Sequence, residues 1–182
     1  MSRRGLILAA PAFFLFSACA VHRPYPAAWE PLPPPPTADC RHFDGKYRDR
    51  GEIPGIPQAQ PSLTQLLFGT SSGWKRATLV SFSLKENDTL EVTVWEGMNS
   101  LFTRTLTSQA GHFACEAGRL VIRDRRGVSG RGVAGFESVT VTLSTTGDNL
   151  VAQVTDVGVG LALILPVAGT TTSWYRFPRE RE

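Results

Sequence analysis

The chain has 182 residues, 42% of them hydrophobic and 19% charged, with a formal net charge of +3 at pH 7. This length suits one domain, because folding at this size buries roughly two-thirds of the surface of the unfolded chain. The basic excess comes from the first residues: without Arg3 and Arg4, 17 Lys and Arg stand against 16 Asp and Glu. A nearly neutral domain lacks the positive surface that binds phosphates, so we exclude nucleic acid as a partner.

The N-terminal segment has the three parts of a secretory signal. It begins with two arginines, continues as an apolar run over residues 5–16, and ends with two small residues before Cys19. The apolar run is shorter than the roughly 20 residues of a membrane-spanning helix but typical of a signal peptide. We therefore predict a signal peptide over residues 1–18.

The sequence Leu15-Phe16-Ser17-Ala18-Cys19 resembles the lipobox of bacterial lipoprotein precursors, with Phe16 where leucine is usual. In those precursors the cysteine thiol receives a diacylglyceryl group, the signal is removed before it, and the new amine is acylated. The resemblance implies lipidation of Cys19 and a lipid-anchored protein. Ala20 stands where an aspartate would favour the inner membrane, which implies the outer membrane with the domain facing the periplasm. An ordinary signal peptide cut near Ala18 or Ala20 and a twin-arginine signal are the alternatives.

Two cysteines remain once Cys19 is assigned to the lipid. Cys40 and Cys115 form an even pair, and in an oxidising compartment a disulfide between them is the default. His42 and His112 stand close to them in sequence, so a tetrahedral zinc site of two cysteines and two histidines is the alternative. We predict the disulfide, no metal and no other cofactor.

Residues 19–39 are predicted to be a tether that starts at the lipidated cysteine. Seven prolines lie between residues 20 and 39, and such a segment favours an extended polyproline conformation of about 3.1 Å per residue. We expect a semi-rigid spacer that holds the domain off the membrane, with Tyr25 and Trp29 near the lipid headgroups. A proline-rich ligand for a partner protein is the alternative.

The predicted domain covers residues 40–178 and contains one short helix near its start. Ser62 is a good N-cap, Gln65 three residues later completes a capping box, and Gly69 is a good C-cap. The leucines between Ser62 and Gly69 lie on one side of that helix. A charged tail, residues 179–182, ends the chain.

From residue 77 onward, apolar residues recur at every second position, as in strands. Residues 80–84 and 90–94 alternate in this way around a turn at Asn87-Asp88, which predicts a hairpin. Further strand-like runs, separated by glycines, are 101–107, 112–116, 120–124, 138–145, 150–156, 158–167 and 172–177. Short strands at regular spacing predict an all-β fold: a small antiparallel up-and-down barrel or a closed meander.

The domain carries two further resemblances. Gly45-x-Tyr47 in the first strand and Arg176 near the end resemble the lipocalin and calycin group, in which a late arginine packs over the aromatic ring of a Gly-x-Trp motif. That implies an eight-stranded barrel with an apolar cavity, for which the candidate lining residues are Val80, Phe82, Val92 and Val94. The closing Trp174-Tyr175-Arg176-Phe177 is similar to the end of small uncharacterised proteobacterial lipoproteins, which implies a fold and a location but no activity.

Other motifs do not indicate an enzyme. Gly130-x-Gly132-x-x-Gly135 matches a dinucleotide fingerprint but leads into a predicted strand rather than a helix, so we interpret it as a loop. The arginines between residues 119 and 131 are interpreted as a hairpin surface, with anionic lipid headgroups as an alternative partner. The unbroken apolar run at residues 161–165 is interpreted as a buried strand, with lipid or a partner as the alternative.

We therefore expect a non-catalytic, outer-membrane-anchored periplasmic lipoprotein that acts as a binding or envelope-assembly module. Its expected partners are the membrane, through Cys19, and a hydrophobic ligand or an envelope protein. A lipocalin-like carrier of a small hydrophobic ligand is the alternative. A hydrolase is third, because no nucleophile, base and orienting group can be assembled from the sequence.

Overall fold

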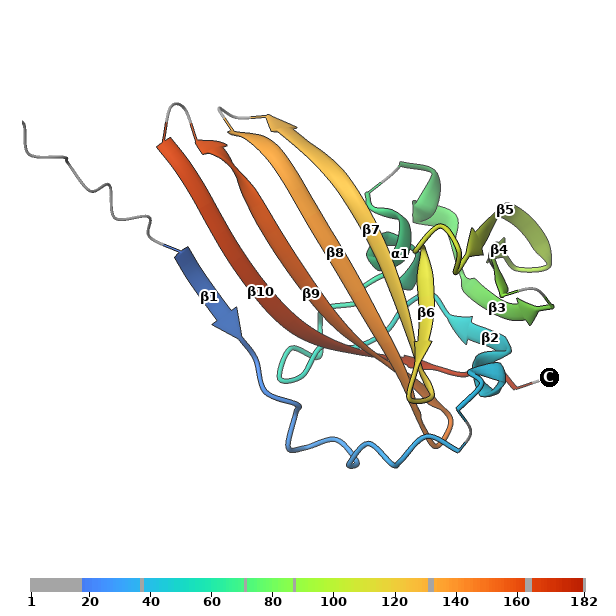
Figure 1. Ribbon diagram of the computed structural model, residues 1–182. Helices are drawn as coiled ribbons and strands as arrows, with labels where there is room; N and C mark the ends of the chain where they lie inside the picture. Colours follow the sequence, from blue (N-terminus) through green and yellow to red (C-terminus); the bar gives the residue numbers. More distant parts are fainter. Residues whose placement is uncertain are drawn as a thin grey trace, which may run out of the picture.

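The computed structural model describes residues 18–36, 38–70, 72–86, 88–130, 133–162 and 165–181, and its strands form two sheets (Figure 1). Several predicted features lie outside these residues. They are the signal peptide as far as Ser17, Thr37 of the predicted tether, Asn87 of the predicted turn, Arg131 of the arginine group, Gly132 of the glycine motif, the centre of the apolar run (Leu163-Ile164), and the last residue of the charged tail.

The larger sheet, called the long sheet below, has the strand order β1-β10-β9-β8-β7-β6. Antiparallel hairpins join consecutive strands from β6 to β10, and β1 adds to the edge of β10 in parallel. The bounds are β1 (Ala18–His22), β6 (Phe113–Glu116), β7 (Arg119–Gly130), β8 (Val133–Thr146), β9 (Asn149–Ala162) and β10 (Leu165–Pro178). The strands from β7 to β10 are therefore much longer than the alternation pattern alone predicts.

The smaller sheet has the order β2-β3-β4-β5, all antiparallel. Its strands are β2 (Gly45–Arg48), β3 (Leu79–Lys85), β4 (Thr89–Glu96) and β5 (Asn99–Thr107). Phe82 of β3 lies opposite Val92 of β4, so the predicted hairpin is confirmed. Both side chains point into the core because alternate residues of a strand face the same side.

The single α-helix, α1 (Leu63–Phe68), has the predicted caps. The hydroxyl of Ser62 accepts a hydrogen bond from the backbone N–H of Gln65 (3.2 Å), and the N–H of Gly69 donates to the carbonyl of Gln65 (2.9 Å). Two short 3-10 helices, η1 (Arg41–Phe43) and η2 (Ser72–Arg76), complete the described helical structure. A helix this short depends on packing for its stability.

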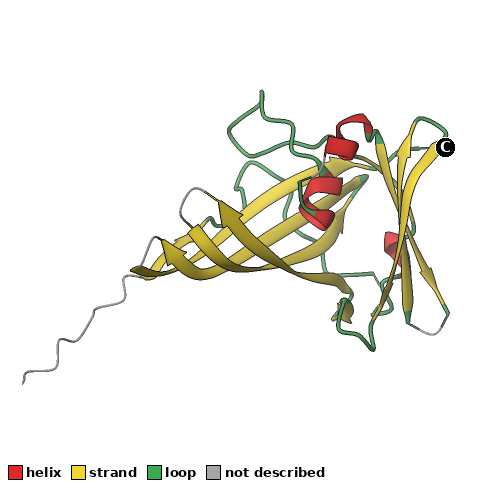
Figure 2. Ribbon diagram, turned by 90° about the horizontal axis from the view of Figure 1, so that it is seen from above, coloured by secondary structure: helices red, strands yellow, loops and turns green. Residues whose placement is uncertain are grey.

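The core lies where α1 and the inner faces of both sheets meet. Figure 2 shows α1 between the long sheet and the smaller sheet. Leu63 and Leu67 of α1 are almost fully buried, and so are side chains from both sheets. The core members from the sheets include Tyr47, Val80, Phe82, Val92, Val141, Leu143, Leu150 and Phe177.

The all-β prediction with one short helix is confirmed, whereas the barrel is not. The described strands form two open sheets, and no closed barrel is found among them. An isolated bridge between Tyr47 and Arg179 joins the sheets on one side. On the other side, β5 pairs only with β4 and β6 only with β7 in the described part of the chain.

A late arginine does pack over the first-strand aromatic ring, but it is Arg179 rather than Arg176. The guanidinium of Arg179 lies 5.7 Å from the centre of the Tyr47 ring, while that of Arg176 lies 5.0 Å from the ring of Trp29. Gly45 makes this possible: a Cβ there would lie 2.8 Å from Arg179, and its φ is +139°. The motif Gly45-x-Tyr47 thus serves a packing contact with the charged tail.

A buried carboxylate holds the start of α1. Asp49 has no exposed surface, and its Oδ1 accepts hydrogen bonds from the Ser62 hydroxyl (3.0 Å) and the Thr64 backbone N–H (2.8 Å). The carboxylate therefore satisfies donors that the first turn of a helix leaves unpaired. The Arg50 guanidinium lies 3.6 Å from its other oxygen.

Asp49→Ala is expected to lower the free energy of unfolding by about 3 kcal/mol, because it leaves two buried donors without a partner. Urea denaturation followed by circular dichroism measures this. Glu86→Ala, at an exposed position, is the matched control and should cost less than about 0.5 kcal/mol. Equal unfolding midpoints for the two variants would show that Asp49 does not stabilise α1.

Candidate functional site

The predicted lipidation site lies at the edge of the long sheet. Cys19 is an exposed free cysteine in β1, opposite Gly169 of β10. The inner face of the sheet is the face that packs on the core, and Glu137 of β8 and Gly158 of β9 belong to it by the alternation of their strands. Cys19 and Gly169 stand in the same row across the ladders as these two residues, so they belong to the inner face as well. The thiol is therefore accessible, and its neighbour across the ladder has no side chain.

The first part of the predicted tether packs against the domain. The Arg23 N–H donates to the Thr172 carbonyl (3.3 Å), and the Trp174 indole donates to the Arg23 carbonyl (2.9 Å). The ring of Tyr25 meets that of Trp174 edge to face, with centroids 5.0 Å apart, and Trp29 is buried. Burial also raises the pKa of Tyr25. This half of the segment therefore does not extend away from the domain as a spacer would, because its aromatic rings find partners on β10.

The ladder register places Cys19 level with the last charged side chains of the sheet. The row that contains it runs Arg126, Glu137, Gly158, Gly169 and Cys19 across five strands. Arg126 is held in place by Asp124 (2.8 Å) and by the carbonyl of Leu66 in α1 (3.0 Å). Charged groups are therefore anchored on the inner face up to this row.

Asp156 lies two residues before Gly158 on the same face of β9. Burial raises its pKa, and the nearby carboxylate of Glu137 raises it further, while Arg126 lowers it. The inner face thus changes from core to a band of charged groups before it reaches the row of Cys19.

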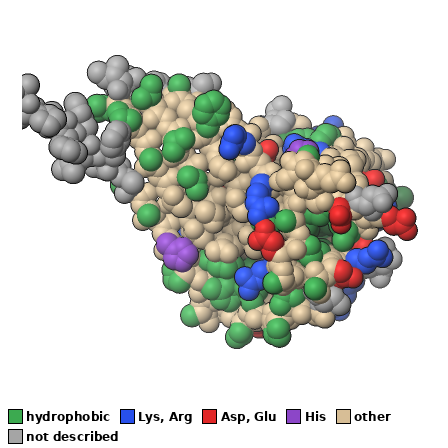
Figure 3. Space-filling view, in the orientation of Figure 1, with side chains coloured by type: hydrophobic (Ala, Val, Ile, Leu, Met, Phe, Trp, Pro, Cys, Tyr) green, Lys and Arg blue, Asp and Glu red, His purple; other side chains and the backbone are tan. Residues whose placement is uncertain are grey.

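Beyond that row, the outer end of the sheet is apolar on both faces. The described ends of the four strands are 127–130, 133–136, 159–162 and 165–168, and they contain only Gly, Ala, Val, Leu, Phe, Pro and Ser129. Phe136 is 64% exposed and Leu165 is 60% exposed. In Figure 3 the part of the sheet next to β1 carries green side chains, and the blue and red ones lie nearer the β6–β7 edge and the smaller sheet.

A groove of about 360 Å³ runs over this end. Apart from the charged Glu137, which belongs to the row of Cys19, its lining is apolar. The lining consists of Gly135, Gly158, Gly160, Gly169, Val128, Phe136, Val159, Val167, Ala168 and Glu137. Gly135 and Gly160 face each other across β8 and β9 so closely that a Cβ on Gly135 would lie 2.2 Å from the Val159 carbonyl oxygen. The close approach explains why two glycines stand opposite each other here.

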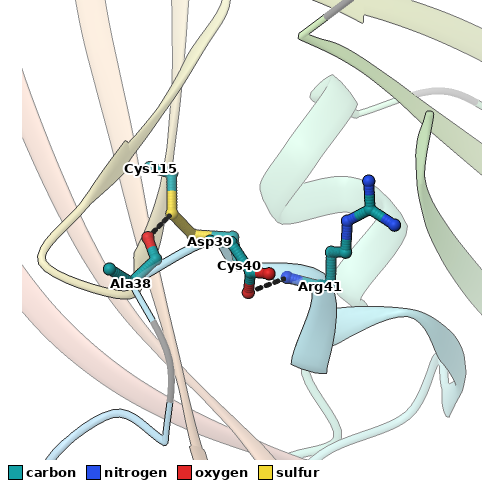
Figure 4. Close-up of a disulfide and its surroundings, with 5 residues drawn as sticks. All are labelled: Ala38, Asp39, Cys40, Arg41 and Cys115. Carbon is teal, nitrogen blue, oxygen red and sulfur yellow. Dashed lines mark hydrogen bonds between the residues drawn. A yellow bond between two sulfur atoms is a disulfide. The ribbon is translucent and has the colours of Figure 1, made fainter. Parts of the chain in front are cut away.

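The predicted disulfide between Cys40 and Cys115 is present, with a Cα–Cα distance of 5.9 Å (Figure 4). It joins the segment before η1 to β6. Next to it, the Ala38 carbonyl oxygen lies 2.9 Å from the Cys115 sulfur. The sulfur atoms of Cys40 and Cys115 are therefore bonded to each other. Within the described residues, no group of three or more His, Cys, Asp and Glu could hold a metal ion.

The two histidines of the alternative zinc site have other surroundings. The His42 ring lies against Phe43, with centroids 4.2 Å apart, and burial lowers its pKa. His112 Nδ1 accepts a hydrogen bond from the backbone N–H of Thr107 (3.4 Å).

The four candidate cavity residues lie in the core. Val80, Phe82, Val92 and Val94 are at most 1% exposed, and the first three belong to the main hydrophobic cluster. Phe82 packs edge to face on Tyr47, with ring centroids 5.8 Å apart. These side chains fill the space between the smaller sheet and its neighbours.

The arginines of β7 have individual roles rather than forming one site. Arg123 pairs with Glu116 and Arg126 with Asp124, while Arg125 is exposed on the outer face. Gly130 and Gly135 belong to strands β7 and β8, so the glycine motif does not lead into a helix. The loop prediction is therefore wrong for the described residues of this motif, whereas the prediction that it leads into a strand is confirmed.

The sequence predicts a buried strand at residues 161–165, but Leu161 (51%) and Leu165 (60%) are exposed, so this prediction is wrong for the described residues of the run. Both residues belong to the apolar end of the sheet, which the sequence pattern does not reveal as one surface. A signal for it exists, because the sequence has no charged residue from Val157 to Tyr175. Only the register shows that residues from four strands meet there beside Cys19.

None of the described helices is long and apolar enough to cross a membrane. Comparison with protein-family models, with curated proteins and with solved structures finds no match to this chain.

Proposed function

We propose that the chain is an outer-membrane lipoprotein, anchored by lipid on Cys19 with its domain in the periplasm, and that it acts as a non-catalytic binding or assembly module. The observation that carries the proposal is the position of Cys19. It follows a lipobox-like sequence, and its thiol is exposed at the start of the described fold. A modifying enzyme could therefore reach it without unfolding the sheet.

The disulfide supports the proposed compartment. Disulfides persist in the bacterial periplasm and are rare in the cytosol. Cys40 and Cys115 are joined, whereas Cys19 is free and exposed. This is the pattern expected if export oxidises one pair and the third cysteine carries a lipid.

Membrane fractionation tests the location. The lipoprotein is expected in the outer-membrane fraction of a sucrose gradient, and Ala20→Asp should move most of it to the inner-membrane fraction. Ala20→Ser is the matched control and should stay with the outer membrane. Recovery of the unmutated protein in the soluble periplasm would contradict anchoring, and identical positions for all three proteins would contradict sorting through residue 20.

The groove of about 360 Å³ favours a second candidate, a carrier of a small hydrophobic ligand. The lipocalin-like version of this function requires a closed barrel with a hollow interior, and the buried positions of Val80 and Phe82 weigh against a cavity there. Native mass spectrometry separates the two functions. Extra mass equal to a lipid, beyond that on Cys19, would favour the carrier, and a chain without it would favour the binding or assembly module.

A further inference from the structure

The outer end of the long sheet has no partner in the described structure that would explain its composition. On the outer face, Phe136 (64%), Val159 (54%) and Leu161 (51%) are exposed. On the inner face, Leu165 (60%) and Val167 (43%) are exposed. Exposed apolar groups gathered on both faces of one sheet end are unusual for a surface in water and mark a contact with a membrane or a partner.

The position of Cys19 along the sheet indicates that the contact is with a membrane rather than with a partner protein. The acyl chains on a lipidated cysteine start at the membrane interface. Cys19 is level with Arg126 and Glu137, which form the last charged row, and every described residue of β7–β10 beyond that row is uncharged. The boundary between charged and apolar side chains on the sheet thus coincides with the position where the lipid would enter the bilayer.

We propose that the outer end of β7–β10 inserts into the membrane interface beside the lipid on Cys19; this rests on the proposed function. The occupant of the apolar surface is the acyl-chain region of the bilayer. From Gly158 to Ala162 the strand advances about 14 Å, so the described end of β9 reaches into one leaflet and does not cross the membrane. Arg123 and Arg125, exposed on the outer face of β7, would lie at the level of the anionic headgroups.

Two features determine how deeply the outer end of the sheet inserts and which strands insert furthest. The edge of β7 beyond Asp124 has no neighbouring strand in the described residues, and unpaired backbone groups are costly in hydrocarbon, which keeps the insertion shallow. Arg131 stands in the sequence between β7 and β8, whereas no charged residue stands between β9 and β10. The described ends of β9 and β10 therefore go deepest.

Site-specific fluorescent labelling of the full lipoprotein tests this. Its three cysteines would be occupied by the lipid and the disulfide, so one introduced cysteine can be labelled alone with an environment-sensitive dye. Leu161→Cys and Leu165→Cys probe the two faces of the hairpin. Met98→Cys, 93% exposed in the smaller sheet's β4–β5 turn, is the matched control.

The labelled proteins are reconstituted into phosphatidylethanolamine and phosphatidylglycerol vesicles with brominated acyl chains, which quench a dye in contact with them. We expect about a twofold or larger loss of fluorescence at positions 161 and 165 and none at position 98, because an interfacial segment lies roughly 5–10 Å into the headgroup and acyl boundary. Quenching at 161 and 165 no greater than at 98 would overturn the proposal. So would cross-linking of position 161 between two copies without quenching, which would assign the surface to a second copy of the chain.

The same preparation separates this proposal from the proposed function. Labelling of Cys19 in the unmutated protein, with no acyl mass by mass spectrometry, would contradict the lipid anchor. Quenching at positions 161 and 165, compared with the fluorescence of the unmutated protein after the same labelling reaction, tests only the insertion of the sheet end.

Discussion

Replacing Cys19 with serine is expected to reduce fatty-acid incorporation to background and to leave the signal peptide attached. A serine hydroxyl is a far weaker nucleophile than a thiolate, so it does not form the thioether on which the later steps depend. Without several acyl chains, each contributing about 0.8 kcal/mol per buried CH₂, the lipid no longer holds the protein at the outer membrane. Metabolic labelling with an alkyne-tagged palmitate measures the loss, and a shift to higher mass on a gel reports the uncut signal.

The matched control for this variant removes the other two cysteines. Cys40→Ala with Cys115→Ala should keep full fatty-acid incorporation, because neither residue belongs to the lipobox-like sequence. Fatty-acid labelling that survives in Cys19→Ser but disappears in the double variant would place the lipid elsewhere. A processed, unlabelled Cys19→Ser protein in the periplasm would instead favour the alternative of an ordinary signal peptide.

Loss of the disulfide is expected to lower the free energy of unfolding by about 4 kcal/mol, because the bond closes a loop that spans 75 residues in sequence. The bond constrains the unfolded chain, and Cys40, which is 1% exposed, also packs in the hydrophobic core. For a chain of this length that loss corresponds to a decrease in Tm of about 10 °C. Cys40→Ala with Cys115→Ala is the variant of choice, since alanine leaves no hydroxyl buried at position 40.

Thermal unfolding with and without dithiothreitol provides the control. The reductant should lower the Tm of the unmutated protein to that of the double variant and leave the double variant unchanged. A Tm that differs by less than about 2 °C between oxidised and reduced protein, which corresponds to under 1 kcal/mol, would mean that the disulfide is not a major source of stability.

The features that could be predicted from the sequence are those that depend on neighbours along the chain. Helix α1 begins and ends where Ser62 and Gly69 cap it, because capping involves residues within one or two turns. The β3–β4 hairpin follows from alternation around a turn of few residues. The disulfide was predictable for a different reason: the predicted export, together with an even number of remaining cysteines, leaves Cys40 and Cys115 as the expected pair.

The features that only the tertiary structure decides involve residues far apart in sequence. The pairing of β1 with β10 brings Cys19 beside Gly169, and the charged tail supplies Arg179, rather than Arg176, to the ring of Tyr47. Periodicity places a residue on a face of a strand, but it does not say which strands become neighbours or whether the sheet closes. Two open sheets and a barrel bury the same alternating side chains, so the pattern does not distinguish them.

The same difference between local and long-range information applies to Cys19 and to the apolar surface beside it. The lipobox-like motif is a local sequence, and it was identified residue by residue. The apolar end of the sheet consists of short stretches of four strands. The apolar run at residues 161–165 stands out in the sequence, but its neighbours on the other strands are set only by the register of the ladders. The local sequence therefore predicts lipid attachment at Cys19, and the long-range pairing of strands decides which residues lie next to that cysteine.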